Sequence, residues 1–298
     1  MNKFLENIKQ SGFTIFDYDK IIFKEKLGRG ANGTVYETLI DDRRYAVKHV
    51  RSQEVVTNYD YKVYLKDILD ELTTISNFDS KRIMKMYGVA CDDEGDVYIV
   101  MELIKNRGCL YDYLYESEHN FTITEKFNIY LSILSAVKVL HDEDYCHSDL
   151  KPENMCYYLD LKKQKKYVKL IDFNCVTKVK KDKRKYIQCV YGTYGYCSPE
   201  QHKYEITLKS DIYSLGIILL ELIYGDYVWD PEYYSYQRYR KSAMEHLNKL
   251  KGIDSTVHSI IKNCLSTVPE KRYSIDELYS EIKKYINSDH IHRISHLG

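Results

Sequence analysis

Three glycines with the spacing G-x-G-x-x-G lie between two segments that both have β-strand character. They lie within Leu27–Val35, after the apolar run Ile21–Phe23 and directly before the β-like run Thr34–Tyr36. A dinucleotide-binding loop with this spacing must open into a helix, so the β-like continuation argues against that fold. Glycine lets backbone N–H groups approach a bound phosphate closely. Three glycines near a turn are also typical of a plain flexible hairpin.

A lysine and an acidic residue downstream fit a phosphate-binding role for this loop. Lys48 ends the apolar, strand-like run Tyr45–Val47, where its ammonium group would sit beneath the loop on phosphate oxygens. Such a lysine needs a carboxylate to fix its position. Glu71 lies on the apolar side of a helix predicted at residues 60–78, and Asp67 on the same face is the alternative partner.

Polar residues are concentrated in two segments of the second half of the chain. His147–Asn154 holds a carboxylate, a lysine and an amide, and a proline within it prevents a regular helix. A strand-like apolar run then ends at Asp172. Asn154 and Asp172 carry oxygen ligands that suit Mg²⁺. Asp149 can accept a proton from a substrate hydroxyl, and Lys151 can steady a transferred phosphate.

Hydrophobic spacing divides the chain into a strand-rich first part and a helical second part. Residues 1–20 are a weakly patterned lead-in, and strand-like runs follow before residue 50 and at 84–91 and 97–103. Beyond residue 108 the apolar spacing is helical, over residues 127–140, 212–223, 257–265 and 278–286. This layout predicts a small sheet with one helix, followed by a larger helical lobe.

Composition excludes several other classes of protein. The chain has 298 residues, of which 44% are hydrophobic, and its 44 basic residues balance 44 acidic ones. This neutrality argues against direct nucleic-acid binding through bulk positive charge. The eight cysteines form no C-x-x-C pair, so we expect neither a dense disulfide framework nor a zinc module. With no signal peptide and no membrane span in the pattern, we expect an intracellular, cytoplasmic protein.

These motifs, in this order, resemble those of the eukaryotic-type protein kinase family, in its Ser/Thr branch. The resemblance runs from about residue 21 to about residue 285. It implies an α+β, two-lobed protein-kinase-like fold, with a small antiparallel β-sheet lobe that carries one helix and a larger, mainly helical lobe. The implied parts are an N-terminal extension at 1–20, a small nucleotide-binding lobe at 21–103, a large catalytic and substrate lobe at 104–288, and a C-terminal tail at 289–298.

The resemblance also implies a reaction and a set of site residues. The reaction is transfer of the γ-phosphoryl group of ATP-Mg²⁺ to Ser or Thr hydroxyls of protein substrates, with Asp149 as the base. We expect Lys48, Asp149, Asn154 and Asp172 to converge around one triphosphate in a cleft between two lobes. The implied catalytic residues are Asp149, Lys151, Lys48 and Glu71, the implied metal ligands are Asn154 and Asp172, and the residues implied to bind ATP are Leu27, Gly28, Arg29, Gly30, Ala31, Asn32, Gly33, Thr34, Val35, Ala46, Lys48, Met101, Glu102, Ile104 and Cys156.

Further family landmarks lie in the second half of the chain. Gly192–Glu200 resembles the end of an activation segment, and Thr193 within it is typical of a Ser/Thr kinase. Asp211 resembles the buried acid that anchors the catalytic loop, and Arg272 is expected to pair with Glu200. These landmarks build a peptide-docking platform, which argues against a small-molecule phosphotransferase on the same two-lobed plan.

Two positions depart from the family pattern. Ser148 stands where the family has an arginine that receives a phosphorylated loop residue, so we expect activity that does not depend on such phosphorylation. Asn174 replaces the glycine after Asp172-Phe173, and asparagine is the non-glycine residue that best tolerates left-handed backbone. Both departures motivate an alternative hypothesis, a pseudokinase that acts as an ATP-binding scaffold.

A basic segment lies between these motifs. Residues 162–185 carry 11 basic residues against two acidic ones, Asp172 and Asp182. One interpretation is attraction to acidic or prephosphorylated protein substrates. The other is a pair of solvated loops without a binding role. The Tyr-, Lys- and Ile-rich composition is typical of A+T-rich coding, as in a poxvirus-type kinase, which would work in the cytoplasm of a host cell.

Overall fold

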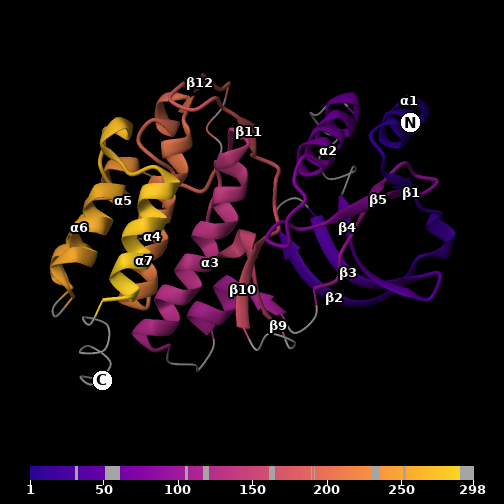
Figure 1. Cartoon of the computed structure of the whole chain (residues 1–298). Coiled ribbons are helices and arrows are strands. Elements are labelled where there is room, and N and C mark those ends of the chain that lie inside the picture. Colours follow the sequence, from indigo (N-terminus) through magenta and orange to yellow (C-terminus); the bar gives the residue numbers. More distant parts are fainter. Residues whose placement is uncertain are drawn as a thin grey trace. The chain divides into compact units, whose positions relative to one another are not determined.

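The computed structural model divides the chain into two compact units, unit 1 at residues 1–106 and unit 2 at residues 107–298. Figure 1 shows their helices and strands. The C-terminal tail predicted at 289–298 lies outside the described residues. The structure describes residues 1–30, 33–50, 61–104, 107–116, 121–160, 165–188, 190, 192–229, 235–250 and 253–288.

Unit 1 is built on a six-stranded sheet with the order β1-β5-β6-β4-β3-β2. All neighbouring strands are antiparallel except β1 and β5, which are parallel. Fully buried Val47, Ala90 and Val100 form the centre of a hydrophobic cluster on the sheet. The strands are β1 (Thr14–Ile15), β2 (Ile22–Gly30), β3 (Gly33–Ile40), β4 (Arg43–Val50), β5 (Met86–Cys91) and β6 (Val97–Met101), with a 3-10 turn η1 (Tyr18–Lys20) before β2.

Among its described residues, unit 1 also has two helices, one more than the sequence predicted. Helix α2 (Tyr61–Ile75) matches the predicted helix and buries its apolar face. Helix α1 (Asn2–Gln10) lies in the segment that we interpreted as a weakly patterned lead-in, and it buries Phe4 and Ile8. It contacts α2 and β1 (Figure 1). The N-terminal segment is therefore part of the packed unit.

Unit 2 is mainly helical. A three-stranded antiparallel sheet, in the order β10-β9-β7, and two antiparallel pairs, β11-β8 and β12-β13, accompany its helices. The helices are α3 (Ile123–Asp142), α4 (Leu208–Tyr224), α5 (Tyr236–Lys249), α6 (Ser255–Cys264) and α7 (Ile275–Ile286). The strands are β7 (Arg107–Cys109), β8 (Tyr145–Cys146), β9 (Met155–Asp160), β10 (Lys165–Leu170), β11 (Thr177–Lys178), β12 (Lys185–Tyr186) and β13 (Glu205–Ile206). Short helical turns are η2 (Asp112–Glu116), η3 (Pro152–Asn154), η4 (Gln201–Lys203) and η5 (Pro269–Lys271).

Helix α4 forms the core of unit 2. Every residue from Ser210 to Leu222 is buried, as the nearly continuous apolar run predicted. The helix begins after the capping residue Thr207 and ends at Gly225, whose φ of 86° favours glycine. It contacts α3, α5 and α6. Within the described part of the chain, no helix has the length and hydropathy needed to cross a bilayer.

Candidate active site

The glycine motif of unit 1 forms the end of the β2–β3 hairpin. Gly28 pairs with Val35, and Gly30 pairs with Gly33. Gly33 has a φ of 140°, and a Cβ atom placed on it would lie 2.2 Å from the carbonyl oxygen of His49. No other residue fits there, because β4 comes too close to the backbone. Of the ATP-binding residues predicted here, Ala31 and Asn32 lie outside the described residues.

Lys48 lies in the middle of the sheet of unit 1. Strand β4 places it between Val35 of β3 and Ile99 of β6. Its Nζ atom lies 3.8 Å from Oε1 of Glu71 on α2, and the two side chains are 15% and 5% exposed. A contact of this kind orients the ammonium group and keeps both charges compensated away from water. Of the two acids considered from the sequence, Glu71 makes the pair, whereas Asp67 is exposed on α2.

The segment after β6 is fixed to the start of β5. Met101 ends β6 and pairs with Ala46 of β4. The N–H of Glu102 donates to the carbonyl of Lys85 at 2.9 Å, and the N–H of Lys85 donates to Oε1 of Glu102 at 2.7 Å. These two bonds hold the backbone that leads to Ile104, which is buried. The predicted adenine-binding segment therefore starts from a fixed position.

In unit 2, Asp149 accepts hydrogen bonds from two side chains. The Thr193 hydroxyl donates to Oδ1 at 2.9 Å, and the Asn154 amide donates to Oδ2 at 3.0 Å. Lys151 Nζ donates to the Thr193 hydroxyl at 2.6 Å and lies 3.6 Å from Oδ2 of Asp149. The structure therefore brings three predicted site residues of one loop together, and it adds Thr193 from a segment further along the chain.

The loop that carries Asp149 is held from below by Asp211, at the start of α4. Asp211 is fully buried, and its carboxylate accepts from the backbone N–H groups of His147 at 2.8 Å and Ser148 at 2.9 Å. The ring of His141 contacts the same carboxylate at 2.9 Å. Burial alone would raise the pKa of Asp211, but the His141 contact and these N–H donors hold that pKa below its ordinary value.

Asp172 and Asn154 lie on neighbouring stretches of backbone. The N–H of Ile171 donates to the carbonyl of Asn154 at 3.1 Å. Asp172 follows directly, and its Oδ1 accepts from the N–H of Asn174 at 3.1 Å. The predicted ATP-binding residue Cys156 is buried on β9, which follows Asn154, and it lies opposite Cys109 of β7. The backbone N–H of residue 174 thus supports the turn that presents Asp172.

An amide oxygen and a carboxylate fit Mg²⁺, which takes one or two protein ligands together with substrate phosphates. Among the described residues, no three His, Cys, Asp or Glu side chains are gathered into a metal-binding group. The pair Asn154 and Asp172 therefore suits an ion that arrives with a phosphate ligand better than it suits a fully protein-bound ion.

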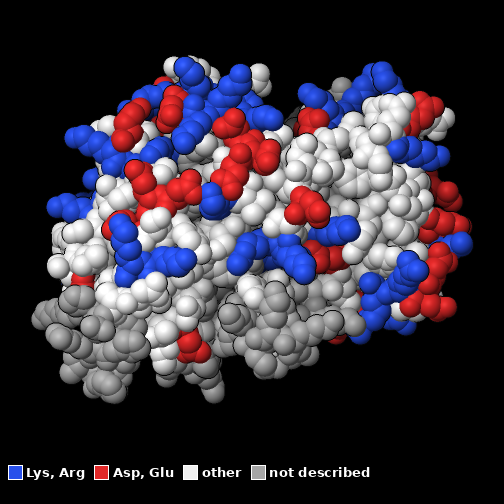
Figure 2. All heavy atoms as spheres, viewed as in Figure 1, with Lys and Arg blue, Asp and Glu red and all other residues white. Residues whose placement is uncertain are grey.

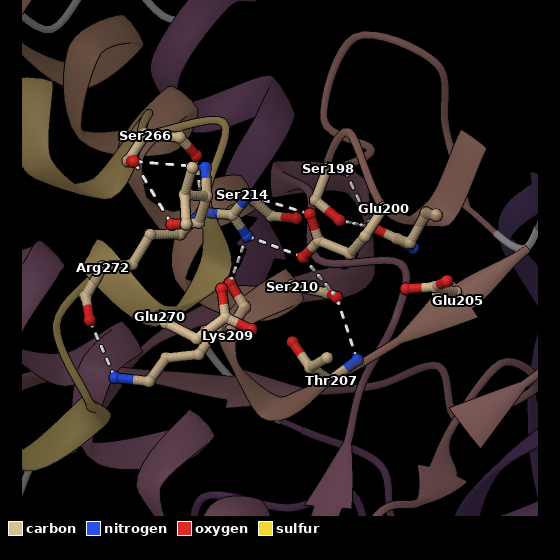
Figure 3. A network of polar contacts seen from close by, with 12 residues as sticks. Ser198, Glu200, Glu205, Thr207, Lys209, Ser210, Ser214, Ser266, Glu270 and Arg272 are labelled. Carbon is tan, nitrogen blue, oxygen red and sulfur yellow. Dashed lines mark hydrogen bonds and ion pairs between the residues drawn. The ribbon is translucent and has the colours of Figure 1, made fainter. Parts of the chain in front are cut away.

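A network of ion pairs and hydrogen bonds fixes the segment after residue 192 (Figure 3). Arg272 donates to both carboxylate oxygens of Glu200, at 2.7 and 2.8 Å, and the Ser210 hydroxyl donates to Glu200 at 2.8 Å. The side chain of Arg272 is 0% exposed. Burial favours the protonated form of Glu200, but Arg272 lowers its pKa below the ordinary value. The predicted pairing of Arg272 with Glu200 is present.

The comparisons with known proteins fit this geometry. Residues 21–282 match the family model described as the protein kinase domain. The chain belongs to the protein kinase family. The matched range covers the glycine hairpin, the Lys48–Glu71 pair, the loop around Asp149 and the Glu200–Arg272 pair, so the fold class inferred from the sequence is confirmed.

Curated relatives of this kinase domain come from distant organisms. A probable serine/threonine-protein kinase, mkcF, of Dictyostelium discoideum is 30% identical over 87% of this chain and 36% of its own length. Wall-associated receptor kinase-like 10 of Arabidopsis thaliana is 30% identical over 87% of this chain and 35% of its own length. A mitogen-activated protein kinase kinase kinase 7-like protein of Drosophila melanogaster is 27% identical over 88% of this chain and 65% of its own length. The chain thus spans only about a third of the first two.

Sequence reasoning missed two contributors to the kinase domain's site. Thr193 was noted only as a marker of the Ser/Thr branch, yet its hydroxyl bridges Lys151 and Asp149. Gln201 drew no attention, yet it is fully buried beside Ser148 and Ser198. Thr193 had a signal, because it follows Gly192 in the stretch that resembles the end of an activation segment. Gln201 had none, because a single polar residue after Glu200 carries no spacing pattern.

Proposed function

We propose that this chain is an ATP-dependent protein serine/threonine kinase, which transfers the γ-phosphoryl group of ATP to Ser or Thr hydroxyls of protein substrates. The arrangement around Asp149 carries the proposal. Its carboxylate is oriented by Asn154 and Thr193, and Lys151 lies within 3.6 Å of it. A carboxylate placed to receive a hydroxyl proton, with a lysine beside it, is suited to phosphoryl transfer.

Each remaining site residue has a role in the proposal. Lys48, oriented by Glu71, would neutralise phosphate oxygens, and the glycine hairpin would cover them with backbone N–H groups. The segment from Met101 to Ile104 would contact the adenine ring. Asn154 and Asp172 would hold Mg²⁺, which supplies charge neutralisation to the phosphates when bound. The proposal requires the residues of both units to act on one ATP molecule.

The departures at Ser148 and Asn174 do not favour a pseudokinase. The N–H of Ser148 is anchored by Asp211, and the N–H of Asn174 supports Asp172. The acids and the lysine that phosphoryl transfer needs are all present. We therefore keep catalysis as the proposed function, with the cytoplasm, where ATP and Mg²⁺ are available, as the proposed location.

The proposed function is tested by phosphoryl transfer in vitro. The purified chain is incubated with radiolabelled ATP, Mg²⁺ and an acidic protein substrate, beside the variant Asp149→Asn. We expect label on Ser and Thr of the substrate with the wild type and strongly reduced label with the variant. Wild-type protein that is folded, binds nucleotide and transfers no label would contradict the proposal and favour a scaffold role.

We further propose that the substrates are acidic or already phosphorylated. Lys178, Lys180, Lys181, Lys183 and Lys185 are exposed in the described part of the basic segment, and Asp182 is the acid among them. Figure 2 shows Lys and Arg side chains gathered around the place where Figure 1 labels β12, with acidic side chains interspersed. Arg184 is already paired with Glu205 and Glu270, both at 2.7 Å, so the lysines carry the proposal.

A peptide library separates this substrate preference from a simply solvated loop. We expect peptides with acidic or phosphorylated residues near the acceptor to be preferred, and the preference to weaken in Lys181→Glu/Lys183→Glu and at high salt. Lys66→Glu, a single exposed charge reversal on α2 of unit 1, is the control. Preference for basic peptides would refute the acidic-substrate proposal. So would a preference for acidic peptides that Lys181→Glu/Lys183→Glu leaves unchanged. Neither result would affect the kinase assignment.

A further inference from the structure

Gln201 uses both ends of its side chain to join two segments of unit 2. It is 0% exposed and begins η4, directly after Glu200. Its Oε1 atom accepts from the backbone N–H of Ser198 at 2.9 Å and from the Ser198 hydroxyl at 3.0 Å. Its Nε2 atom donates to the carbonyl oxygen of Ser148 at 2.8 Å. One neutral amide therefore links the segment after residue 192 to the loop that carries Asp149.

The Ser148 end of this link is the residue directly before Asp149. Ser148 has a φ of 68°, a left-handed conformation that non-glycine residues adopt only when their surroundings hold them there. Two side chains supply that restraint. Asp211 accepts from the Ser148 N–H at 2.9 Å, and Gln201 donates to the Ser148 carbonyl. The backbone that sets the direction of Asp149 is thus held on both of its peptide groups.

The other end of the link is rigid. Glu200, the residue before Gln201, is fixed to Arg272 and Ser210 (Figure 3). Gly192 packs against the same junction, and a Cβ atom on it would lie 2.6 Å from the Ser148 carbonyl oxygen. The junction between the two segments is therefore close-packed, with no room for an added side-chain atom. Gln201 is presented to Ser148 from a platform that cannot easily move away.

We propose that Gln201 is a positioning residue, which couples the segment that ends at Glu200 to Asp149 through the Ser148 carbonyl and so holds the base in its working direction without any phosphorylated residue. The inference rests on the proposed kinase function. Its physical basis is that a small misplacement of a catalytic group is costly, and that directional hydrogen bonds in a buried site prevent such misplacement. The amide of Gln201 is neutral and binds the backbone carbonyl of Ser148, so this link needs no cationic side chain at position 148.

The test compares Gln201→Met, Gln201→Glu and the control Tyr130→Phe. Methionine has nearly the shape of glutamine but cannot join Ser198 to Ser148. Glutamate keeps the oxygen that accepts from Ser198 and places a second oxygen against the Ser148 carbonyl. Tyr130→Phe removes another buried hydrogen bond of unit 2, from the Tyr130 hydroxyl to the Leu215 carbonyl, on the helices α3 and α4.

We expect both Gln201 variants to lower kcat by about 10- to 100-fold while the KM for ATP changes by less than about threefold. Tyr130→Phe should lower the melting temperature about as much as the two Gln201 variants do, and it should leave kcat within about twofold of the wild-type value. A Gln201→Met enzyme with wild-type kcat, or an equal loss of kcat in Tyr130→Phe, would refute the positioning role.

Hydrogen–deuterium exchange separates a failure of this inference from a failure of the proposed function, because it needs no activity. If Gln201 positions the loop, the backbone amides of residues 147–150 exchange faster in Gln201→Met than in Tyr130→Phe. Equal exchange in the two variants would refute the inference even if the wild type transfers no phosphoryl group. Absence of transfer by the wild type, with faster exchange in Gln201→Met, would reject the kinase function and retain the link.

Discussion

The two ends of α4 each bury a carboxylate, and the structure treats the two acids in opposite ways. Asp211 lies in the first turn of the helix and Glu221 in the last. Both side chains are almost completely buried, at 0% and 1% residue exposure. Yet the pKa of Asp211 is lowered, whereas the pKa of Glu221 is raised to about 8. Burial is shared, so the difference must come from the neighbours of each carboxylate.

The neighbours at the start of α4 favour a charged acid. Asp211 receives two backbone N–H donors and the ring of His141. Its position in the first turn also places it near the positive end of the helix dipole. These contacts outweigh the cost of burial, so the carboxylate stays ionised. An ionised Asp211 can hold the backbone of His147 and Ser148 firmly.

The neighbours at the end of α4 favour a neutral acid. Burial is the main cause of the raised pKa of Glu221, and the negative charge of Glu153 adds to it. The hydroxyls of Tyr115 and Tyr196 donate to Oε2, both at 2.9 Å, and they lower the pKa only in part. Among the described residues Oε1 has no hydrogen-bond partner, so a negative charge there would be poorly compensated.

This difference teaches that one helix serves two purposes. Its start supports the loop of the proposed base with an ionised group, and its end stabilises the packing around Tyr115 and Tyr196 with a neutral one. Damage at the start should therefore reach catalysis, whereas damage at the end should change stability and its dependence on pH.

The largest effect is expected at the base itself, where chemistry can be removed without touching α4. Asp149→Asn should lower kcat by about 10²- to 10⁴-fold, because the amide cannot accept the substrate proton. We expect only a small fall in melting temperature: the amide oxygen of the variant can still accept from the Thr193 hydroxyl, and the NH2 group that would face the Asn154 amide lies on a side chain that is 16% exposed. Steady-state kinetics and thermal unfolding measure the two quantities. A variant that keeps more than about half of wild-type kcat would show that Asp149 is not the base.

A smaller but double effect is expected from Asp211→Asn. The amide would place a donor against an N–H donor of His147 or Ser148, so we expect a loss of about 3–5 kcal/mol in the free energy of unfolding. We also expect kcat to fall, because the Ser148–Asp149 backbone loses its anchor. Urea unfolding and kinetics measure both. Asp142→Asn, whose carboxylate is 52% exposed in a surface pair with Lys138, is the control and should cost less than about 1 kcal/mol.

If Asp211→Asn destabilised unit 2 but left kcat intact, the start of α4 would have no catalytic role, and the contrast between its two ends would disappear. The reverse result, a loss of kcat with full stability, would mean that the free-energy cost of burying the charge of Asp211 equals the stabilisation from its contacts. Either outcome is distinguishable from the expected joint loss.

The sequence predicts one end of α4 better than the other. Asp211 was predicted as the buried anchor because a family motif surrounds it, and the apolar run from Ile212 predicted the buried helix. Glu221 is a single charged residue within that run, and no motif surrounds it. Its partner Tyr115 lies 106 residues earlier in the chain, and no local pattern reports a contact made by tertiary packing. The direction of its pKa therefore could not be read from the sequence.

The same limit explains which elements were missed. Helix α5 is mostly polar, so hydrophobic spacing gave no signal for it, and α1 buries only Phe4 and Ile8. By contrast α2, α3, α6 and α7 have regular apolar faces and were predicted within a few residues. The site residues followed the same rule. Those in compact motifs were found, whereas the roles of Thr193 and Gln201 depend on where distant segments meet.

At the end of α4, pH provides the test. The pKa of Glu221 is about 8 in the folded chain against an ordinary value of 4.5, so the folded state binds the extra proton between those values. Stability should therefore fall as pH rises from about 5 to about 8, by up to about 1.4 kcal/mol per pH unit from this group. Glu221→Gln cannot lose a proton, so it should flatten that slope while kcat stays within about threefold.

Chemical unfolding at several pH values measures this slope for the wild type, for Glu221→Gln and for the surface control Glu245→Gln. The control should keep the wild-type slope, because the Glu245 side chain is 52% exposed. Asp211 adds no slope in this range, since its lowered pKa leaves it ionised in both states above about pH 5. Parallel curves for wild type and Glu221→Gln would mean that Glu221 is ionised when folded, and the contrast would be wrong.

At the start of α4, we expect that removal of phosphate from the chain has no effect on kcat. Phosphatase treatment of the purified chain should leave kcat unchanged within about twofold. In place of an arginine that would receive a phosphate, Ser148 is held by the ionised Asp211 on its N–H and by Gln201 on its carbonyl. A phosphate on the activation segment therefore has no guanidinium at position 148 to attract it. Mass spectrometry before and after treatment verifies that phosphate was removed. If the treated enzyme lost its activity, a phosphate bound by a cationic side chain elsewhere, rather than the two buried hydrogen bonds to Ser148, would hold the loop of Asp149 in place.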